Sequence, residues 1–345
     1  MRVENAEKDF TDKLVVFTEN LLTRRARKIE KKKRKQKARG PVMEWVDAFL
    51  WAVMVVLLLN QYLLQAYQIP SGSMRNTLIG GVNRETGRRD TSDRIFVNKF
   101  IFGFELLPGC CKTPGFREPE RSEVIIFENP EYEKRSIAYE IVQRVLYMAT
   151  LSMLDLNRIG HADAHQFLIK RQVAQDGDRV NFIQGELYIQ PRGSSEMINE
   201  EDFKKESGLT YGNHLLLDNA YYKNLDAKIK ASITDSAGLP VDKKTAEEAS
   251  AEWISGLKTI PYDRYEEERI SSDILRKLYP YHKTYVNINA AKTNGIYVPK
   301  GWVLPLGDNR NDSLDGRYFG PVRKKDLLGK ALFIYWPLNR FGVIK

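Results

Sequence analysis

Cysteine and histidine are both scarce in this chain of 345 residues. The two cysteines, Cys110 and Cys111, are adjacent, and a disulfide between neighbours in sequence would be strained. They are also too few for a disulfide framework or a four-cysteine zinc site. His161 and His165 are four residues apart, but two ligands alone do not make a metal site. We therefore expect neither a bound metal nor a cofactor.

Excess charge of one sign is absent outside one short stretch. Residues 1–40 carry 14 Lys and Arg against 6 Asp and Glu, which leaves a balance of only +1 for the rest of a chain whose net charge is +9. A nucleic-acid-binding domain would need a basic face on its folded part. We therefore expect no nucleic-acid partner and interpret residues 1–41 as a solvated basic tail.

Long apolar runs are absent except for one, which extends from Trp45 to Leu64 and carries a single formal charge, Asp47. A helix of this length rises about 30 Å, which matches the hydrocarbon core of a bilayer. A buried helix of a soluble protein is disfavoured because the run is apolar on all sides. A cleaved signal peptide is disfavoured because no small-x-small site follows.

An uncleaved transmembrane anchor over residues 42–66 is the better interpretation. Cytoplasmic flanks of such anchors are enriched in Lys and Arg. We therefore expect a single-pass protein of the cell (inner or cytoplasmic) membrane, with a cytoplasmic N-terminus and the remaining chain on the extracytoplasmic side.

Short apolar runs separated by Gly and Asp turns predict a mainly β, antiparallel core with α-rich insertions. The predicted strands are 94–97, 123–127, 167–173, 179–183, 186–189 and 331–335. The predicted organisation is a cytoplasmic tail (1–41), an anchor (42–66), a catalytic β core (67–190 and 291–345) with a helical insertion (131–163), and an inserted α-rich secondary domain (191–290).

Three segments carry residues suited to chemistry. The first is the turn Ser71-Gly72-Ser73-Met74, directly after the anchor. No histidine occupies a comparable turn, so a Ser-His-Asp triad has no obvious candidate. The second segment is the apolar run Phe167-Leu168-Ile169-Lys170, whose lysine could act as the base if burial lowers its pKa. The alternative is an ordinary lysine on a strand edge that faces solvent.

The third segment, residues 306–320, holds three Asp, two Arg, two Asn and one Ser. Such density favours a rigid polar network. A calcium loop is the alternative, but the spacing is not that of an EF-hand and two arginines oppose cation binding.

Taken together, these segments resemble type I signal peptidases, the membrane-anchored Ser/Lys-dyad leader peptidases of the S26-type family. The resemblance covers residues 42–190 in pieces and 295–340 well. The matching motifs stand in the family's order behind the anchor: Ser71-Gly72-Ser73-Met74, then Asp93-Arg94-Ile95-Phe96-Val97, then Lys170-Arg171 with Gly177-Asp178-Arg179-Val180, then Gly307-Asp308-Asn309-Arg310 with Ser313, Asp315 and Arg317.

The chain departs from the family pattern at three places, none of which is the nucleophile or the base. Asn76 stands where the family commonly has proline, Ala174-Gln175-Asp176 replaces Gly-Leu-Pro, and Glu123 replaces an aspartate. These differences concern local turn geometry and the details of the pocket.

The resemblance implies a serine endopeptidase that removes signal peptides from exported precursor proteins after small residues, in an Ala-x-Ala-like pattern. It implies that Ser73 is the nucleophile and Lys170 the general base. The backbone N–H of Ser73 and the hydroxyl of Ser71 would form the oxyanion hole. The partners would be precursor proteins and the phospholipid bilayer.

The resemblance also implies supporting roles in the polar segment. Ser313 would hydrogen-bond and orient Lys170, and Asp315 and Arg317 would hold the loop through a charge-assisted pair. The substrate would add as a strand beside Gln68-Ile69-Pro70 and the run before Lys170.

Two other functions compete with this one. A catalytically inactive, membrane-anchored relative is opposed by the presence of both Ser73 and Lys170. A soluble self-cleaving Ser-Lys regulator is opposed by the apolar span and by the lack of an N-terminal DNA-binding motif.

Residues 136–156 predict an amphipathic helix. Ile141, Val145 and Met148 fall on one side, whereas Gln143, Arg144 and Tyr147 fall on the other. Packing on the domain's own sheet and contact with the membrane surface are both compatible with this pattern. We favour surface contact because Ser73 follows the apolar run by only nine residues.

Overall fold

The computed structural model describes residues 41–344, with gaps at 76, 83–86, 106–111, 133–135, 151–152, 155, 157–165, 213–216 and 252–261, and a few isolated positions before residue 41. Several positions named above therefore lie outside the described residues: most of the basic tail, Asn76, Cys110, Cys111, His161 and His165.

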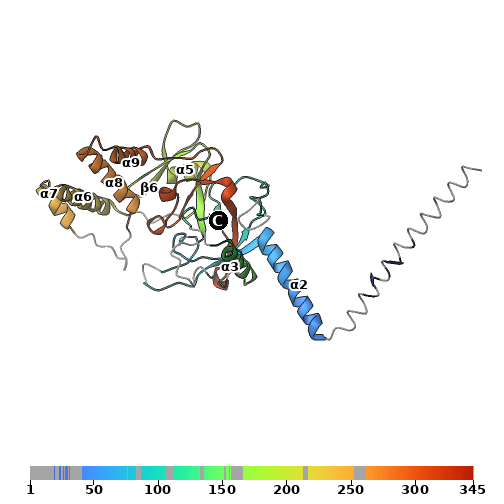
Figure 1. Cartoon of the computed structure of the whole chain (residues 1–345). Coiled ribbons are helices and arrows are strands. Elements are labelled where there is room, and N and C mark those ends of the chain that lie inside the picture. The colour runs from blue at the N-terminus through green and yellow to red at the C-terminus, as the bar shows by residue number, and fades with distance from the viewer. Residues whose placement is uncertain are drawn as a thin grey trace, which may run out of the picture. The chain divides into compact units, whose positions relative to one another are not determined.

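The apolar run forms α2 (Pro41–Tyr62), which in Figure 1 is one continuous helix. Within the described part of the chain, it is the one helix whose length and composition suit a membrane span. Its last turn gives way directly to sheet pairing. Leu63 N still bonds Leu59 O, whereas Leu63 O accepts from Lys99 N. The chain therefore passes from the helix to β1 (Leu64–Gln68) without a linker.

The larger sheet has the strand order β1-β2-β11-β3-β4-β9-β10, with β12 beside β11. Every pairing in it is antiparallel. Its strands are β1, β2 (Arg94–Asn98), β3 (Val124–Glu128), β4 (Phe167–Gln175), β9 (Trp302–Leu306), β10 (Val322–Arg323), β11 (Leu327–Trp336) and β12 (Gly342–Val343).

The smaller sheet is also antiparallel, with the order β7-β6-β5-β8. Its strands are β5 (Arg179–Ile183), β6 (Glu186–Gln190), β7 (Ile198–Asn199) and β8 (Ile296–Tyr297). The expected antiparallel, mainly β fold with one N-terminal apolar helix is confirmed.

The chain between β7 and β8 is helical. It forms α5 (Glu200–Ser207), α6 (Asn219–Ser236), α7 (Lys243–Ser250), α8 (Arg264–Leu278) and α9 (Lys283–Asn294). In Figure 1, α6 lies beside α7 and α8 lies beside α9, as their residue contacts also show. Short helical turns, η1 (Arg310–Asp312), α10 (Gly316–Phe319), η2 (Lys324–Asp326) and η3 (Leu338–Arg340), complete the C-terminal part.

The amphipathic segment forms α3 (Ile137–Ala149), which ends earlier than the predicted Leu156. Ser136 Oγ caps its start by accepting from Tyr139 N, and Thr150 ends it. The hydroxyl of Thr150 bonds both Leu146 O and Leu154 N. This side chain replaces the next helical backbone bonds, so the helix stops there.

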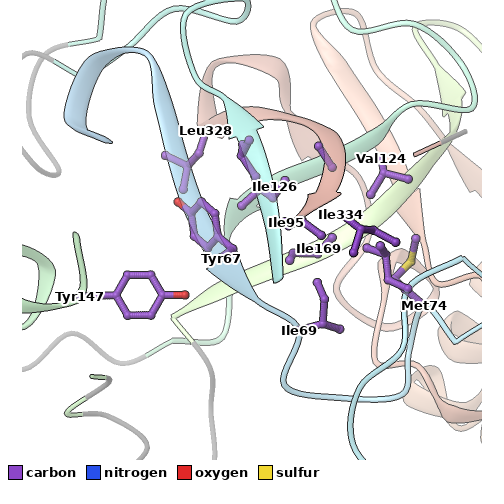
Figure 2. Packing of buried hydrophobic residues seen from close by; sticks show 13 residues of the cluster. Tyr67, Ile69, Met74, Ile95, Val124, Ile126, Tyr147, Ile169, Leu328 and Ile334 are labelled. Atoms are coloured by element: carbon purple, nitrogen blue, oxygen red, sulfur yellow. The ribbon is translucent and has the colours of Figure 1, made fainter. Parts of the chain in front are cut away.

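One buried apolar cluster lies beside the serine turn. Figure 2 shows side chains from β1, β2, β3, β4 and β11 meeting Met74 of the turn and Tyr147 of α3. Met74 is 1% exposed and Leu78 is fully buried. These two side chains fix the segment after Ser73 in the core.

Candidate active site

Ser73 lies in a turn that is held from both sides. Met74 anchors it in the core, and the loop after β9 binds its backbone. Asn309 N donates to Ser73 O at 3.0 Å, and Asn309 Nδ2 donates to Gly72 O at 3.0 Å. The Ser73 hydroxyl therefore has a fixed position, and the side chain is nearly buried.

Lys170 points at this hydroxyl from β4. Its Nζ lies 2.8 Å from Ser73 Oγ and 3.2 Å from Ile169 O. β4 is an inner strand, and Lys170 pairs with Ile125 of β3. The lysine is only 3% exposed, so it is not the solvent-facing strand lysine of the alternative interpretation.

Burial changes the protonation of Lys170. Loss of hydration lowers its pKa from 10.5 to about 8, although the nearby carboxylates of Asp315 and Asp308 oppose that change. A lysine with such a pKa is substantially neutral at mildly basic pH. A neutral amine that accepts a hydrogen bond from a serine hydroxyl can also accept its proton.

The loop between β9 and α10 needs a glycine at its start. A Cβ on Gly307 would lie 2.2 Å from Ser313 Oγ and 2.6 Å from Ser73 O. Asp315 Oδ2 accepts from Gly307 N at 2.9 Å, which holds the glycine against the serine turn. Arg317 Nε donates to Asp315 Oδ1 at 2.9 Å, and both side chains are buried. Burial opposes the charge of Asp315, but Arg317 outweighs it and lowers the pKa of the carboxyl group.

The residue after Lys170 makes a second connection to the same loop. Arg171 is fully buried and binds both carboxylate oxygens of Asp308, at 2.8 Å and 2.7 Å. It also donates to Thr77 Oγ1 at 2.9 Å. Arg171 and Asp308 both belong to the motifs quoted above, but their pairing was not predicted. The signal that could have indicated it is the alternation of side chains along a strand, because neighbouring residues such as Lys170 and Arg171 point to opposite faces of a sheet.

The two other serines lie close to the pair without contacting Lys170. Ser71 Oγ is 3.4 Å from Ser73 Oγ. Ser313 is buried, but among the described residues no hydrogen bond joins its hydroxyl to Lys170 Nζ. The expected orienting bond from Ser313 is therefore not formed in this structure, where the Ile169 carbonyl accepts from the amine instead.

A pocket opens over the two catalytic candidates. It is lined on one side by Ile69-Pro70-Ser71 and on the other by Phe167-Leu168-Ile169, with Ser73, Met74 and Lys170 between them. β1 is the end strand of its sheet, and β9 pairs with β4 only from Arg171 onward. Within the described part of the chain, the backbone of residues 167–170 thus has an open edge beside the serine.

One further contact could not be predicted from the sequence. Glu200, the first residue of α5, forms an ion pair of 2.6 Å with Arg310 of the loop between β9 and α10. Both side chains are 3% exposed. The inserted helical segment is therefore attached to the loop that holds the serine turn. Among the described residues, no group of three His, Cys, Asp or Glu side chains is arranged to hold a metal ion.

Comparison with known proteins identifies the family that this chain matches. A family model described as "Signal peptidase, peptidase S26" matches residues 42–336. A protein of Haemophilus influenzae named signal peptidase I is 24% identical over 322 residues, which is 90% of this chain and 74% of the relative. Its namesake in Aquifex aeolicus is 24% identical over 296 residues, 84% of this chain and 82% of the relative. The signal peptidase I of Buchnera aphidicola subsp. Baizongia pistaciae is 23% identical over 306 residues, which is 86% of this chain and 77% of the relative.

Proposed function

The chain belongs to the signal peptidase family, peptidase S26, and from this premise we propose that it removes signal peptides from exported precursor proteins with a Ser73–Lys170 dyad. The similarity to proteins named signal peptidase I supports a hydrolase that acts on signal peptides. The catalytic residues, the preference for small side chains and the membrane anchor are parts of the proposal.

The observation that carries the proposal is the 2.8 Å contact between Lys170 Nζ and Ser73 Oγ in a pocket with an open strand edge. The distance lies within reach of direct proton transfer. The pocket places the same two groups beside backbone that can pair with an extended peptide. A catalytically inactive relative would have no need for a desolvated lysine on the serine.

In the first step, neutral Lys170 accepts the proton of Ser73 as the serine oxygen attacks the scissile carbonyl. The resulting oxyanion would be stabilised by the Ser73 N–H and the Ser71 hydroxyl. The protonated lysine then gives its proton to the leaving amine. In the second step, the lysine takes a proton from water as the water oxygen attacks the ester, and it returns that proton to the Ser73 oxygen as the acyl bond breaks, which regenerates both groups.

The substrate is an extended segment that ends in small residues. It would pair with the backbone before Lys170 and with that of Ile69-Pro70. Ile69, Phe167 and Ile169 line the pocket near the serine and would form the walls of subsites for alanine-like side chains.

The enzyme would be held in the membrane by α2. The span Val42–Tyr62 suits a bilayer core, and the basic tail before it favours a cytoplasmic N-terminus. This orientation puts the catalytic domain on the extracytoplasmic side, where signal peptides emerge.

The test is cleavage of a radiolabelled precursor with an Ala-x-Ala site by the purified full-length protein. Ser73→Ala and Lys170→Ala should each abolish the product, whereas Lys99→Ala should leave cleavage intact. Lys99 is a suitable control because it is also buried, at 2% exposure, but does not line the pocket. Retained cleavage by either dyad variant, or cleavage elsewhere than after the small residues, would contradict the proposal.

A further inference from the structure

Helix α3 turns an apolar face outward, which is the reverse of a helix on the surface of a soluble domain. Its exposed described positions are Ala138, Ile141, Val142, Val145 and Ala149. They recur at spacings of three and four residues, so they form one continuous stripe. Ile141 is 47% exposed and Val142 is 52% exposed.

The inward face of α3 is held by polar contacts. Arg144 is 7% exposed, forms an ion pair of 2.9 Å with Glu105, and lies over the ring of Phe167 at 5.4 Å. Gln143 Oε1 accepts from Leu156 N at 3.1 Å. Turning the apolar face inward would carry Arg144 away from Glu105 and leave that carboxylate, which is 13% exposed, without its ion-pair partner, which is unfavourable. The orientation is therefore fixed by the fold.

This helix adjoins the outer end of α2. Asn60 Nδ2 donates to Met148 O at 3.4 Å, and Gln61 Nε2 donates to the backbone oxygen of Glu105 at 3.0 Å. Glu105 in turn pairs with Arg144 of α3, so two connections join the helices. The exposed stripe thus begins where the apolar span ends.

We propose that the stripe formed by Ala138, Ile141, Val142, Val145 and Ala149 lies in the lipid bilayer surface as an interfacial helix. The proposal rests on the membrane anchor of the proposed function. The stripe is continuous with the end of the span, its described members are all uncharged, and it is about 16 Å long, which suits a short helix buried in the headgroup region. Hydrophobic burial rather than attraction to anionic lipid drives the contact.

Docking of α3 bears on the active site through two contacts. Tyr147 OH accepts from Gln68 N at 3.4 Å, and Arg144 lies over Phe167, which lines the substrate pocket. Figure 2 shows Tyr147 reaching from α3 toward Tyr67 of β1. A bilayer that holds α3 therefore holds both walls of the pocket at a set depth.

The experiment is spin labelling of the full-length protein in phosphatidylcholine vesicles. Cys110→Ser and Cys111→Ser remove the native thiols, and Ser73→Ala makes the measurement independent of catalysis. Val142→Cys carries the label, and Tyr281→Cys, at a residue 96% exposed before α9, is the matched control. We expect the label at 142 to be accessible to oxygen and to lose most of its accessibility to a water-soluble nickel chelate, whereas the control is open to nickel.

The outcomes separate this proposal from the proposed function. If the protein floats with vesicles but the label at 142 is open to nickel, the stripe does not lie in lipid. Dipolar broadening between labels on two copies would assign the stripe to a dimer and also overturn the proposal. If the protein does not float, the membrane anchor fails as well.

A second variant tests the consequence for activity. Ile141→Glu combined with Val145→Glu should reduce precursor cleavage in vesicles and leave it unchanged in detergent. The measurement in detergent is the folding control, because a misfolded protein would lose activity there as well. An equal loss in both media would show that the stripe is only structural.

Discussion

The rate of cleavage should follow the deprotonation of a single buried lysine. Lys170 has a pKa of about 8, against 10.5 for an exposed lysine. At pH 7 this change raises the neutral fraction from roughly 0.03% to roughly 10%, a gain of about 300-fold. The corresponding free energy against charging is about 3 kcal/mol. If the neutral amine is the base, as proposed, kcat/KM should rise tenfold per pH unit below pH 8 and level off above it.

The assay is kcat/KM for one precursor between pH 6 and 10. Lys99 and Lys112 provide the control, because burial also lowers the pKa of each to about 8. Lys99→Met should leave the midpoint of the pH profile of kcat/KM unchanged if the rise in kcat/KM reports the deprotonation of Lys170. Lys170→Arg should be inactive at every pH, since a guanidinium cannot release its proton.

Three results would refute this reasoning. A midpoint near 10 would show that burial does not favour the neutral amine. A shift of the midpoint in Lys99→Met would show that the pH dependence of kcat/KM reports a group other than Lys170. Turnover by Lys170→Arg close to that of the parent enzyme would exclude a lysine base altogether.

Three further predictions follow from the same geometry. Ser71→Ala should lower kcat by about 10²–10³-fold without abolishing it, because one backbone donor of the oxyanion hole remains. Single-turnover kinetics at saturating substrate measure this loss, and full activity of the variant would show that the Ser71 hydroxyl does not belong to the oxyanion hole. Glu200→Gln should cost about 3–5 kcal/mol of unfolding free energy, because it leaves the buried charge of Arg310 without its partner. Glu201→Gln, on a side chain 47% exposed, should cost less than about 1 kcal/mol, and equal midpoints in urea would contradict the assigned role of the buried pair. Protease added to right-side-out vesicles should digest residues 65–345 and spare the basic tail, and a protected large domain would reverse the orientation.

The strands were predictable where apolar and polar residues alternate between turns. The runs at 179–183 and 186–189 coincide with β5 and β6, which a turn at Gln184-Gly185 separates. β1 was not predicted as a strand because its first residue belongs to the same apolar run as the helix, and composition does not mark where one ends. The pairing of β1 with β2, which ends the helix, is a long-range contact.

The contact between Ser73 and Lys170, which are 97 residues apart, was implied by the family resemblance, whereas the residues alone left Lys170 open as an ordinary strand lysine. The pair of Glu200 and Arg310 was not, because one acidic residue in a charged helical segment carries no sign of a distant partner. The two faces of α3 were predicted, apart from Met148, which lies on the buried side. Which face is buried depends on Glu105 and Phe167, and those contacts exist only in the folded chain.

If α2 spans the bilayer and Ser73 is the nucleophile, as proposed, the absence of a linker between α2 and β1 limits how far above the bilayer the protein can cleave a substrate. Ten residues lie between Tyr62 and Ser73, and five of them form a strand paired to β2. Even a fully extended chain of that length reaches no more than about 40 Å. In the proposed arrangement, Ser73 therefore lies within a limited distance of the membrane surface. We expect a precursor to be cleaved only if its cleavage site lies within this distance of the membrane surface. The distance between the membrane and the cleavage site would then contribute to substrate selection.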